Sequence, residues 1–192
     1  MLISHERYAF LMYVLFGSEK NTYIASSKAA YRDLCRTLRL GATGGEQYRR
    51  HIDSILESRV VNILSHKNLT QSEYDSWHHS VCDMIIKYYT SNDITFTIGQ
   101  AQKWLNMMMK YLYIRGDEGV EHTLSLMHVP IDQYIFRAVE RELKIPRPCF
   151  AWSKLNNYNT YLAYQERIRT VLEIAPLLWE IEAWLGEASI SE

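Results

Sequence analysis

The strongest pattern in the chain is an apolar stretch from Gly99 to Tyr113 that is hydrophobic on almost every side of a helix. Such a pattern is typical of a helix that is buried all round. Only a few polar side chains interrupt it, and Lys103, Asn106 and Lys110 share one narrow stripe because they stand at i, i+3 and i+7. Buried lysines are costly, so we expect this stripe to face a partner or a water-filled cleft.

A second segment, from Met127 to Val139, starts a new helix at Asp132, just after Pro130. An aspartate at a helix start ordinarily caps the free backbone N–H groups and favours the positive end of the helix dipole. The same geometry keeps the carboxylate ionised, so it could also stabilise a cation or activate a water molecule. We expect Asp132 and the lysine stripe to meet in one cleft.

The rest of the chain also follows helical periodicity, so the sequence predicts an all-α, multi-helix fold of about eight or nine helices. It forms one domain over 1–192, with 1–90 and 91–192 as candidate lobes flanking a cleft. A capping box, Thr70 to Glu73, opens one helix, and residues 42–45 form the most flexible joint. The expected helices cover residues 8–16 (a buried first helix), 26–40 (ended by Gly41), 46–64, 70–89, 99–113, 120–127, 132–143, 159–172 and 176–185, with 94–97 as an extended connector.

Composition narrows the function classes. The formal net charge is −1, so a nucleic-acid partner would have to be held by a local patch. Three widely spaced cysteines without a CxxC motif indicate a reducing, cytoplasmic setting and argue against a disulfide scaffold or zinc site. No apolar run approaches the roughly 20 residues that span a bilayer, and no signal peptide is recognised. We therefore expect a soluble protein without metal, cofactor or membrane partner.

Several residues can be interpreted either as functional or as purely structural. We place Lys103 in the first turn of its helix, where the dipole and partial burial disfavour the ammonium and make the amine a better nucleophile. Lys110 is the competing candidate, although lysines in buried helices commonly reach solvent through their long side chains. The histidines lack metal-ligand spacing and read as ordinary helix residues. An arginine cluster could contact phosphates or simply be a solvated helix face: Arg32, Arg36, Arg39, Arg49, Arg50 and Arg59.

The segments Gly99-Gln-Ala-Gln-Lys103 and Val129-Pro-Ile-Asp132, the latter continuing to Arg137, resemble the active-site region of the helix-hairpin-helix DNA glycosylases. That family carries a Gly-rich hairpin ending in a lysine, a helix, and a Val-Pro-Val-Asp-like segment. The usual Leu-Pro-Gly-Val-Gly hairpin is missing here, and the interval from Lys103 to Asp132 is long. In this respect the chain looks closer to the archaeal 8-oxoguanine glycosylase branch of that family, whose hairpin is atypical.

The resemblance implies a DNA glycosylase that flips a damaged or modified base out of double-stranded DNA and cleaves its N-glycosidic bond. The base would be an oxidised purine or a hypermodified phage base, in repair or phage defence. Asp132 would be the catalytic carboxylate and Lys103 the amine nucleophile, which would add strand cleavage, with Lys110 as fallback. The base would be bound by Asn106, Gln102, Trp104 and His128, and the DNA backbone by Gly99, Arg49, Arg50 and Arg137.

Two other classes stay open. In a non-catalytic helical nucleic-acid-binding or adaptor protein, Asp132 is only a helix cap and the lysine stripe a solvated groove. A metal hydrolase is disfavoured because the required ligand spacing is missing. Asp132→Asn separates the glycosylase from the non-catalytic protein: asparagine is also a competent cap, so the substitution should abolish base release by a glycosylase and leave a non-catalytic protein unchanged.

Overall fold

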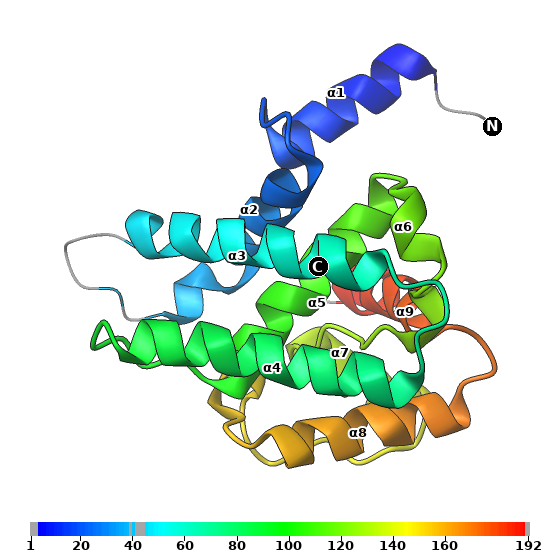
Figure 1. Ribbon diagram of the computed structural model, residues 1–192. Coiled ribbons are helices and arrows are strands. Elements are labelled where there is room, and N and C mark those ends of the chain that lie inside the picture. The colour runs from blue at the N-terminus through cyan, green and yellow to red at the C-terminus, as the bar shows by residue number, and fades with distance from the viewer. Residues whose placement is uncertain (1–3, 39, 41–44, 191–192) are drawn as a thin grey trace.

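The computed structural model describes residues 4–38, 40 and 45–190, and all regular structure within these ranges is helical (Figure 1). The predicted all-α class is confirmed. The nine α-helices of these ranges are α1 (His5–Phe16), α2 (Thr22–Leu34), α3 (Glu46–Leu64), α4 (Gln71–Thr90), α5 (Ile98–Ile114), α6 (Glu118–Glu121), α7 (Gln133–Glu142), α8 (Tyr158–Val171) and α9 (Pro176–Ile190). Three short 3-10 helices are η1 (Cys35–Thr37), η2 (Leu124–Leu126) and η3 (Trp152–Lys154).

Helix α5 is the centre of the molecule, as its apolar pattern predicted. Every residue from Ile98 to Lys110 is buried. Helices α2 and α4 pack against α5, as do η3 and α8 from the C-terminal half of the chain. A continuous set of buried residues extends from Ala30 to Ala183, so the candidate lobes 1–90 and 91–192 share one hydrophobic core.

The capping signals in the sequence fix several helix starts. Thr70 and Glu73 form the predicted capping box at the start of α4. Helix α3 has the predicted bounds, and residues 94–97 connect α4 to α5 without forming a strand. The predicted helix over 120–127 is divided between α6 and η2. None of the helices in the described ranges is long and apolar enough to cross a membrane.

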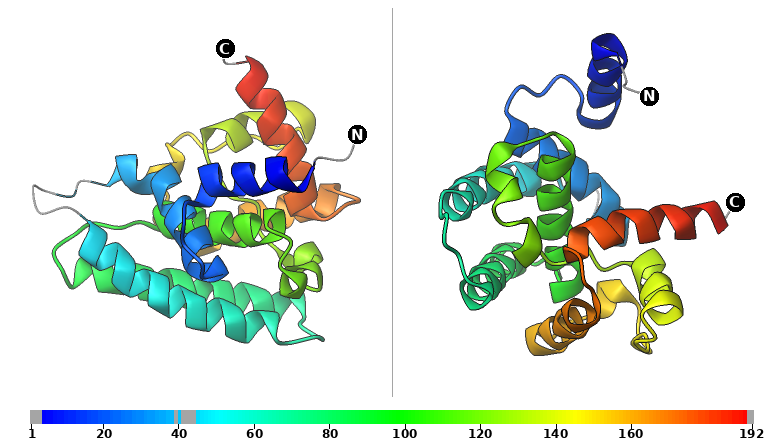
Figure 2. Two further views of the ribbon diagram at one scale, coloured as in Figure 1. Left: turned by 90° about the horizontal axis from the view of Figure 1, so that it is seen from above. Right: turned by 90° about the vertical axis from the view of Figure 1, so that its right-hand side faces the viewer.

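Two N-terminal predictions are wrong. Helix α2 begins at Thr22, because the Asn21 side chain accepts hydrogen bonds from the first backbone N–H groups, and Ser26 and Ser27 lie buried inside the helix. Helix α1 is not buried: Phe16 at its end is covered and Met12 is partly covered, but the rest of the helix is exposed and stands away from the body (Figure 2). The predicted stop at Gly41, the joint from 42 to 44 and Arg39 lie outside the described residues.

Candidate active site

Helix α5 carries Lys103 into the interior. The helix starts in a capping box, in which the Thr97 hydroxyl accepts from the Gln100 N–H at 3.2 Å and the Gln100 side chain accepts from the Thr97 N–H at 3.0 Å. This cap makes Ile98 the first helical residue, so Lys103 lies in the second turn of the helix. The prediction that it lies in the first turn is wrong. Because the dipole effect fades beyond the first turn, it contributes little at Lys103. Lys103 is buried, with only 4% of the residue exposed.

Two buried glutamines hold the extended segment that leads into α7. The Gln165 side chain donates to the Val129 carbonyl at 2.9 Å and accepts from the Val129 N–H at 3.1 Å. Gln102 makes the same pair of bonds to Ile131, at 2.9 and 3.1 Å. Alternate residues of an extended chain direct their backbone groups to the same side, so these glutamines replace the neighbouring strand that the segment lacks. They fix the backbone immediately before Asp132.

The two carboxylate oxygens of Asp132 have different partners. Oδ1 accepts a hydrogen bond from the Ile135 N–H at 2.9 Å and thereby caps α7. Oδ2 accepts from Lys103 Nζ at 2.8 Å. The side chains of Lys103 and Asp132 are 5% and 13% exposed, so this ion pair is largely screened from water. The expectation that this lysine and this aspartate meet is confirmed.

Lys103 and Asp132 form part of the wall of an open cavity of about 620 Å³. Aromatic rings from three elements face it: Tyr134 of α7, Trp152 of η3 and Trp184 of α9. The remaining lining residues are Leu15, Arg32, Asp33, Arg36, Met107, Lys110, Tyr111, Ile114, Gln133, Ile181 and Leu185. A volume of this size, with apolar walls and a few convergent charged groups, is typical of a small-molecule site.

Lys110, which also lines the cavity, forms a second ion pair. Lys110 Nζ is 2.8 Å from Oε2 of Glu180, a fully buried residue of α9 that the sequence analysis missed. Burial raises the pKa of Glu180, and the attraction of Lys110 opposes only part of that effect. The Lys110 ammonium is also 5.7 Å from the ring centre of Trp184. Lys110 is therefore fixed to α9, whereas Lys103 is fixed to the start of α7.

The other residues predicted to bind the base do not line this cavity. Asn106 donates to the Tyr161 hydroxyl at 2.8 Å and accepts from His78 at 3.0 Å on another side of α5. The Trp104 indole is in the core and donates to the Ser27 carbonyl at 3.1 Å. Gln102 is occupied by the backbone bonds described above, and His128 is 1% exposed. Their contacts are structural.

The predicted DNA-backbone residues are also engaged elsewhere. The Gly99 N–H donates to the Leu155 carbonyl at 2.8 Å, so it is not available to a phosphate. Arg49 is buried against Asp53. Arg50 is exposed and paired with Glu46 at 2.7 Å, and Arg137 is paired with Glu187 at 2.8 Å. Among the predicted cluster, Arg32 and Arg36 are the arginines that line the cavity.

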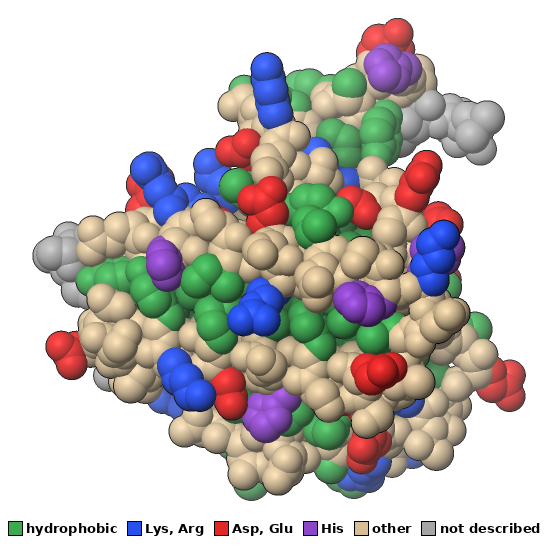
Figure 3. All heavy atoms as spheres, in the orientation of Figure 1, with side chains coloured by type: hydrophobic (Ala, Val, Ile, Leu, Met, Phe, Trp, Pro, Cys, Tyr) green, Lys and Arg blue, Asp and Glu red, His purple; other side chains and the backbone are tan. Residues whose placement is uncertain are grey.

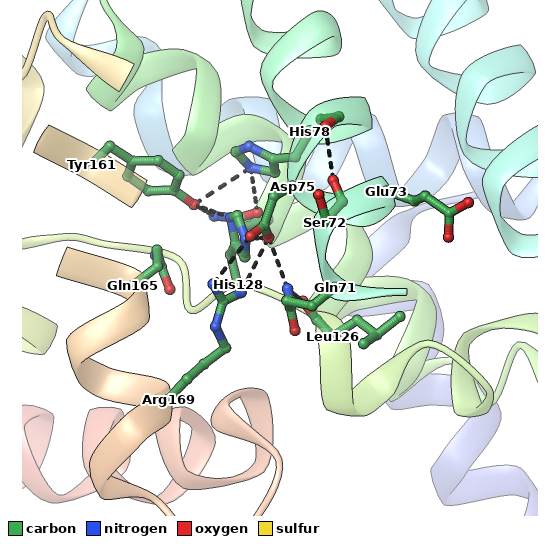
Figure 4. Close-up of polar contacts among 12 residues, drawn as sticks. Gln71, Ser72, Glu73, Asp75, His78, Leu126, His128, Tyr161, Gln165 and Arg169 are labelled. Atoms are coloured by element: carbon green, nitrogen blue, oxygen red, sulfur yellow. Dashed lines mark hydrogen bonds and ion pairs between the residues drawn. The ribbon is translucent and has the colours of Figure 1, made fainter. Parts of the chain in front are cut away.

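Behind the extended segment lies a buried polar network that sequence analysis did not identify. His128 lies 2.7 Å from Asp75 and 2.9 Å from the Tyr161 hydroxyl, and Arg169 and Gln71 also donate to Asp75 (Figure 4). Burial alone would raise the pKa of Asp75, but these hydrogen bonds outweigh it and hold that pKa well below its usual range. The network joins α4, α8 and the segment before Asp132.

No group of His, Cys, Asp or Glu residues in the described ranges could hold a metal ion. Comparisons of the chain with protein-family models, with curated proteins and with solved structures found no match. The resemblance to the helix-hairpin-helix DNA glycosylases therefore stays a prediction that rests on the segments around Lys103 and Asp132.

Proposed function

We propose that this protein is a DNA glycosylase that takes a modified base, turned out of the double helix, into the cavity beside Lys103 and Asp132. The observation that carries the proposal is the 2.8 Å Lys103–Asp132 pair in the wall of an open, aromatic-lined cavity. A largely buried ion pair contributes little to stability, because desolvation of both charges offsets their attraction. The position of this pair in the wall of an open cavity therefore favours a chemical role.

The aromatic walls suit a flat, uncharged ring. Nucleobases that leave the stack are commonly held between aromatic or apolar side chains. Tyr134 of α7, Trp152 of η3 and Trp184 of α9 line the cavity and supply such surfaces. An oxidised purine or a hypermodified pyrimidine would enter this space, with the sugar at the level of the ion pair.

The charges of the pair match the needs of N-glycosidic bond cleavage. As the bond breaks, its electrons leave with the base and positive charge develops on the sugar, which the Asp132 carboxylate stabilises. The Lys103 ammonium gives one proton to the departing base and then, as an amine, attacks C1′. The products are the free neutral base and a sugar whose C1′ is bonded to the protonated Lys103 nitrogen. The C1′–O4′ bond of the sugar then opens, a proton passes from nitrogen to O4′, and the C1′=N Schiff base that borohydride reduces is formed. If water attacks instead, the product is an abasic site.

Contact with the DNA backbone is assigned to the cavity edge. Arg32 and Arg36 line the cavity from α2 and η1 and replace Gly99, Arg49 and Arg50 in this role. With a chain charge of −1, binding would depend on this local patch and weaken as salt increases.

The proposal is tested on duplexes containing an oxidised purine and on genomic DNA carrying hypermodified pyrimidines, scored for base release. Borohydride reduction of the reaction should trap a protein–DNA adduct that is lost in Lys103→Gln and kept in Lys110→Gln. An adduct that is lost only in Lys110→Gln would show that Lys110, and not Lys103, is the nucleophile. Absence of base release from every substrate would favour the non-catalytic binding protein.

A further inference from the structure

Helix α1 exposes a large apolar surface. Its side chains are apolar around most of the helix, but it projects from the body, and apolar side chains are visible on it in the space-filling view (Figures 2 and 3). The most exposed are Phe10 at 67%, Tyr13 at 62% and Val14 at 56%. These residues stand at i, i+3 and i+4 and form one continuous seam along the helix. A second, less exposed row consists of Tyr8, Leu11 and Leu15.

Only the C-terminal end of α1 is fixed to the body. Phe16 packs edge-on against Tyr111 of α5, with ring centres 5.5 Å apart, and the Arg115 guanidinium lies 4.6 Å from the Phe16 ring centre. Arg32 donates to the Leu15 carbonyl. Beyond Gly17, whose φ of 72° favours glycine, the chain turns into α2. The position of α1 is therefore defined at its base, while its first two turns contact little of their own chain.

The exposed area is too large for an ordinary monomer surface. Phe and Tyr each carry roughly 150–250 Å² of surface, so the two rows together expose on the order of 700 Å². The largest apolar patch of a typical monomer is about 300–600 Å². A standard interface buries about 800 Å² on each partner, so α1 alone supplies most of what a stable dimer needs.

Charge favours a protein partner over DNA or a membrane. Helix α1 carries one acidic residue, Glu6, and one basic residue, Arg7, both in its first turn. Helices that bind phosphates or anionic lipids have an excess of basic residues, which α1 lacks. Its middle and end are uncharged.

We propose that α1 is a dimerisation helix that packs against α1 of a second copy of this chain across a two-fold axis. A two-fold interface uses the same surface on both copies. The seam of Phe10, Tyr13 and Val14 lies at its centre and the row of Tyr8, Leu11 and Leu15 lies beside the seam, so the interface uses the whole exposed apolar area of α1. Because Leu15 lines the cavity, the interface lies beside the cavity entrance. The inference does not depend on the proposed function.

The test is the mass of the full chain in solution, measured by light scattering after gel filtration and by sedimentation at micromolar concentrations. The wild type should have twice the chain mass of 22.6 kDa. In the triple variant Phe10→Gln, Tyr13→Gln, Val14→Gln, which keeps helix-forming residues, the dimer dissociation constant should rise at least about 100-fold. Its circular dichroism and urea midpoint should match the wild type at concentrations where both are monomeric.

The matched control exchanges apolar residues of similar exposure elsewhere: Val61→Gln, Val171→Gln and Ile174→Gln, at 45%, 51% and 52% exposed. This control should remain dimeric. A wild-type chain that stays monomeric, or a triple variant that dimerises as the wild type does, would overturn the proposal. So would a monomer whose α1 seam is required for binding to anionic vesicles or to duplex DNA.

Discussion

Replacing Gln102 by leucine tests how the fold positions Asp132. Leucine fills a similar volume but removes the amide that bonds both backbone groups of Ile131, so the buried N–H and carbonyl of Ile131 lose their partners. Each buried, unpaired backbone group costs about 1–3 kcal/mol, which predicts a total loss of about 2–6 kcal/mol for the two groups. For a chain of this length, each kcal/mol lowers the melting temperature by about 2–4 °C, so it should fall by roughly 4–24 °C.

Gln165→Leu is the matched control, because Gln165 makes the same two bonds to Val129, farther from Asp132. Gln165→Leu should lose less stability than Gln102→Leu in urea unfolding, because the Val129 carbonyl also accepts from Asn106 Nδ2 at 3.3 Å and keeps that partner. Only Gln102→Leu should slow base release strongly, on the order of 100-fold, since a displacement of about 1 Å at a reacting group has that effect. Rates are compared below the melting temperature of both variants. A stability loss below about 1 kcal/mol in both, or a larger rate loss in Gln165→Leu, would refute the reasoning.

Three further predictions concern other parts of the structure. Gly99→Ala should destabilise the protein by about 1–3 kcal/mol in urea unfolding, because a Cβ there would lie 1.9 Å from the Trp152 carbonyl oxygen. Gly186→Ala, whose Cβ would have its nearest neighbour at 4.0 Å, should be neutral or stabilising in the same assay, and equal effects of the two variants would contradict this. Burial lowers the pKa of both His78 and His128, so below about pH 6.5 the unfolded chain binds more protons than the folded one. The free energy of unfolding should therefore decrease as the pH is lowered, by up to about 2.7 kcal/mol per pH unit, and an unchanged value between about pH 7.5 and 5.5 would contradict this. Arg36→Gln should reduce the salt dependence of DNA binding by about one unit of log–log slope, while Arg50→Gln, whose arginine is paired with Glu46, should leave it nearly unchanged in a fluorescence anisotropy titration; the reverse order would contradict the assignment.

The sequence identified the central ion pair because each partner was unusual for its place. A lysine in a helix that is otherwise apolar needs a partner, and the aspartate after Pro130 starts the next long helix. Asn106 was assigned to the same stripe and is not in the cavity. Three residues turn a helix by about 300°, so Asn106 points about 60° away from Lys103, enough to reach the network around Tyr161.

Other features depend on contacts between distant parts of the chain. Gln102 and Gln165 act through hydrogen bonds to residues 29 and 36 positions away, and the periodicity of apolar residues does not predict such long-range pairings. Glu180 looks like an ordinary charged residue until α9 places it beside Lys110. For α1, the apolar pattern predicted a buried helix, but whether a helix packs against its own chain depends on distant residues, and the structure leaves most of α1 exposed.

Base release by Asp132→Asn tests the central claim most directly. Asparagine still caps α7 through its side-chain oxygen, but it leaves the largely buried Lys103 ammonium without a carboxylate partner. The variant should therefore lose up to about 3–5 kcal/mol of unfolding free energy, and rates are compared under conditions where both proteins are folded. It loses the negative charge that faces Lys103, and we predict single-turnover base release slowed by at least about 100-fold. A folded Asp132→Asn protein that releases the base at the wild-type rate would contradict the account.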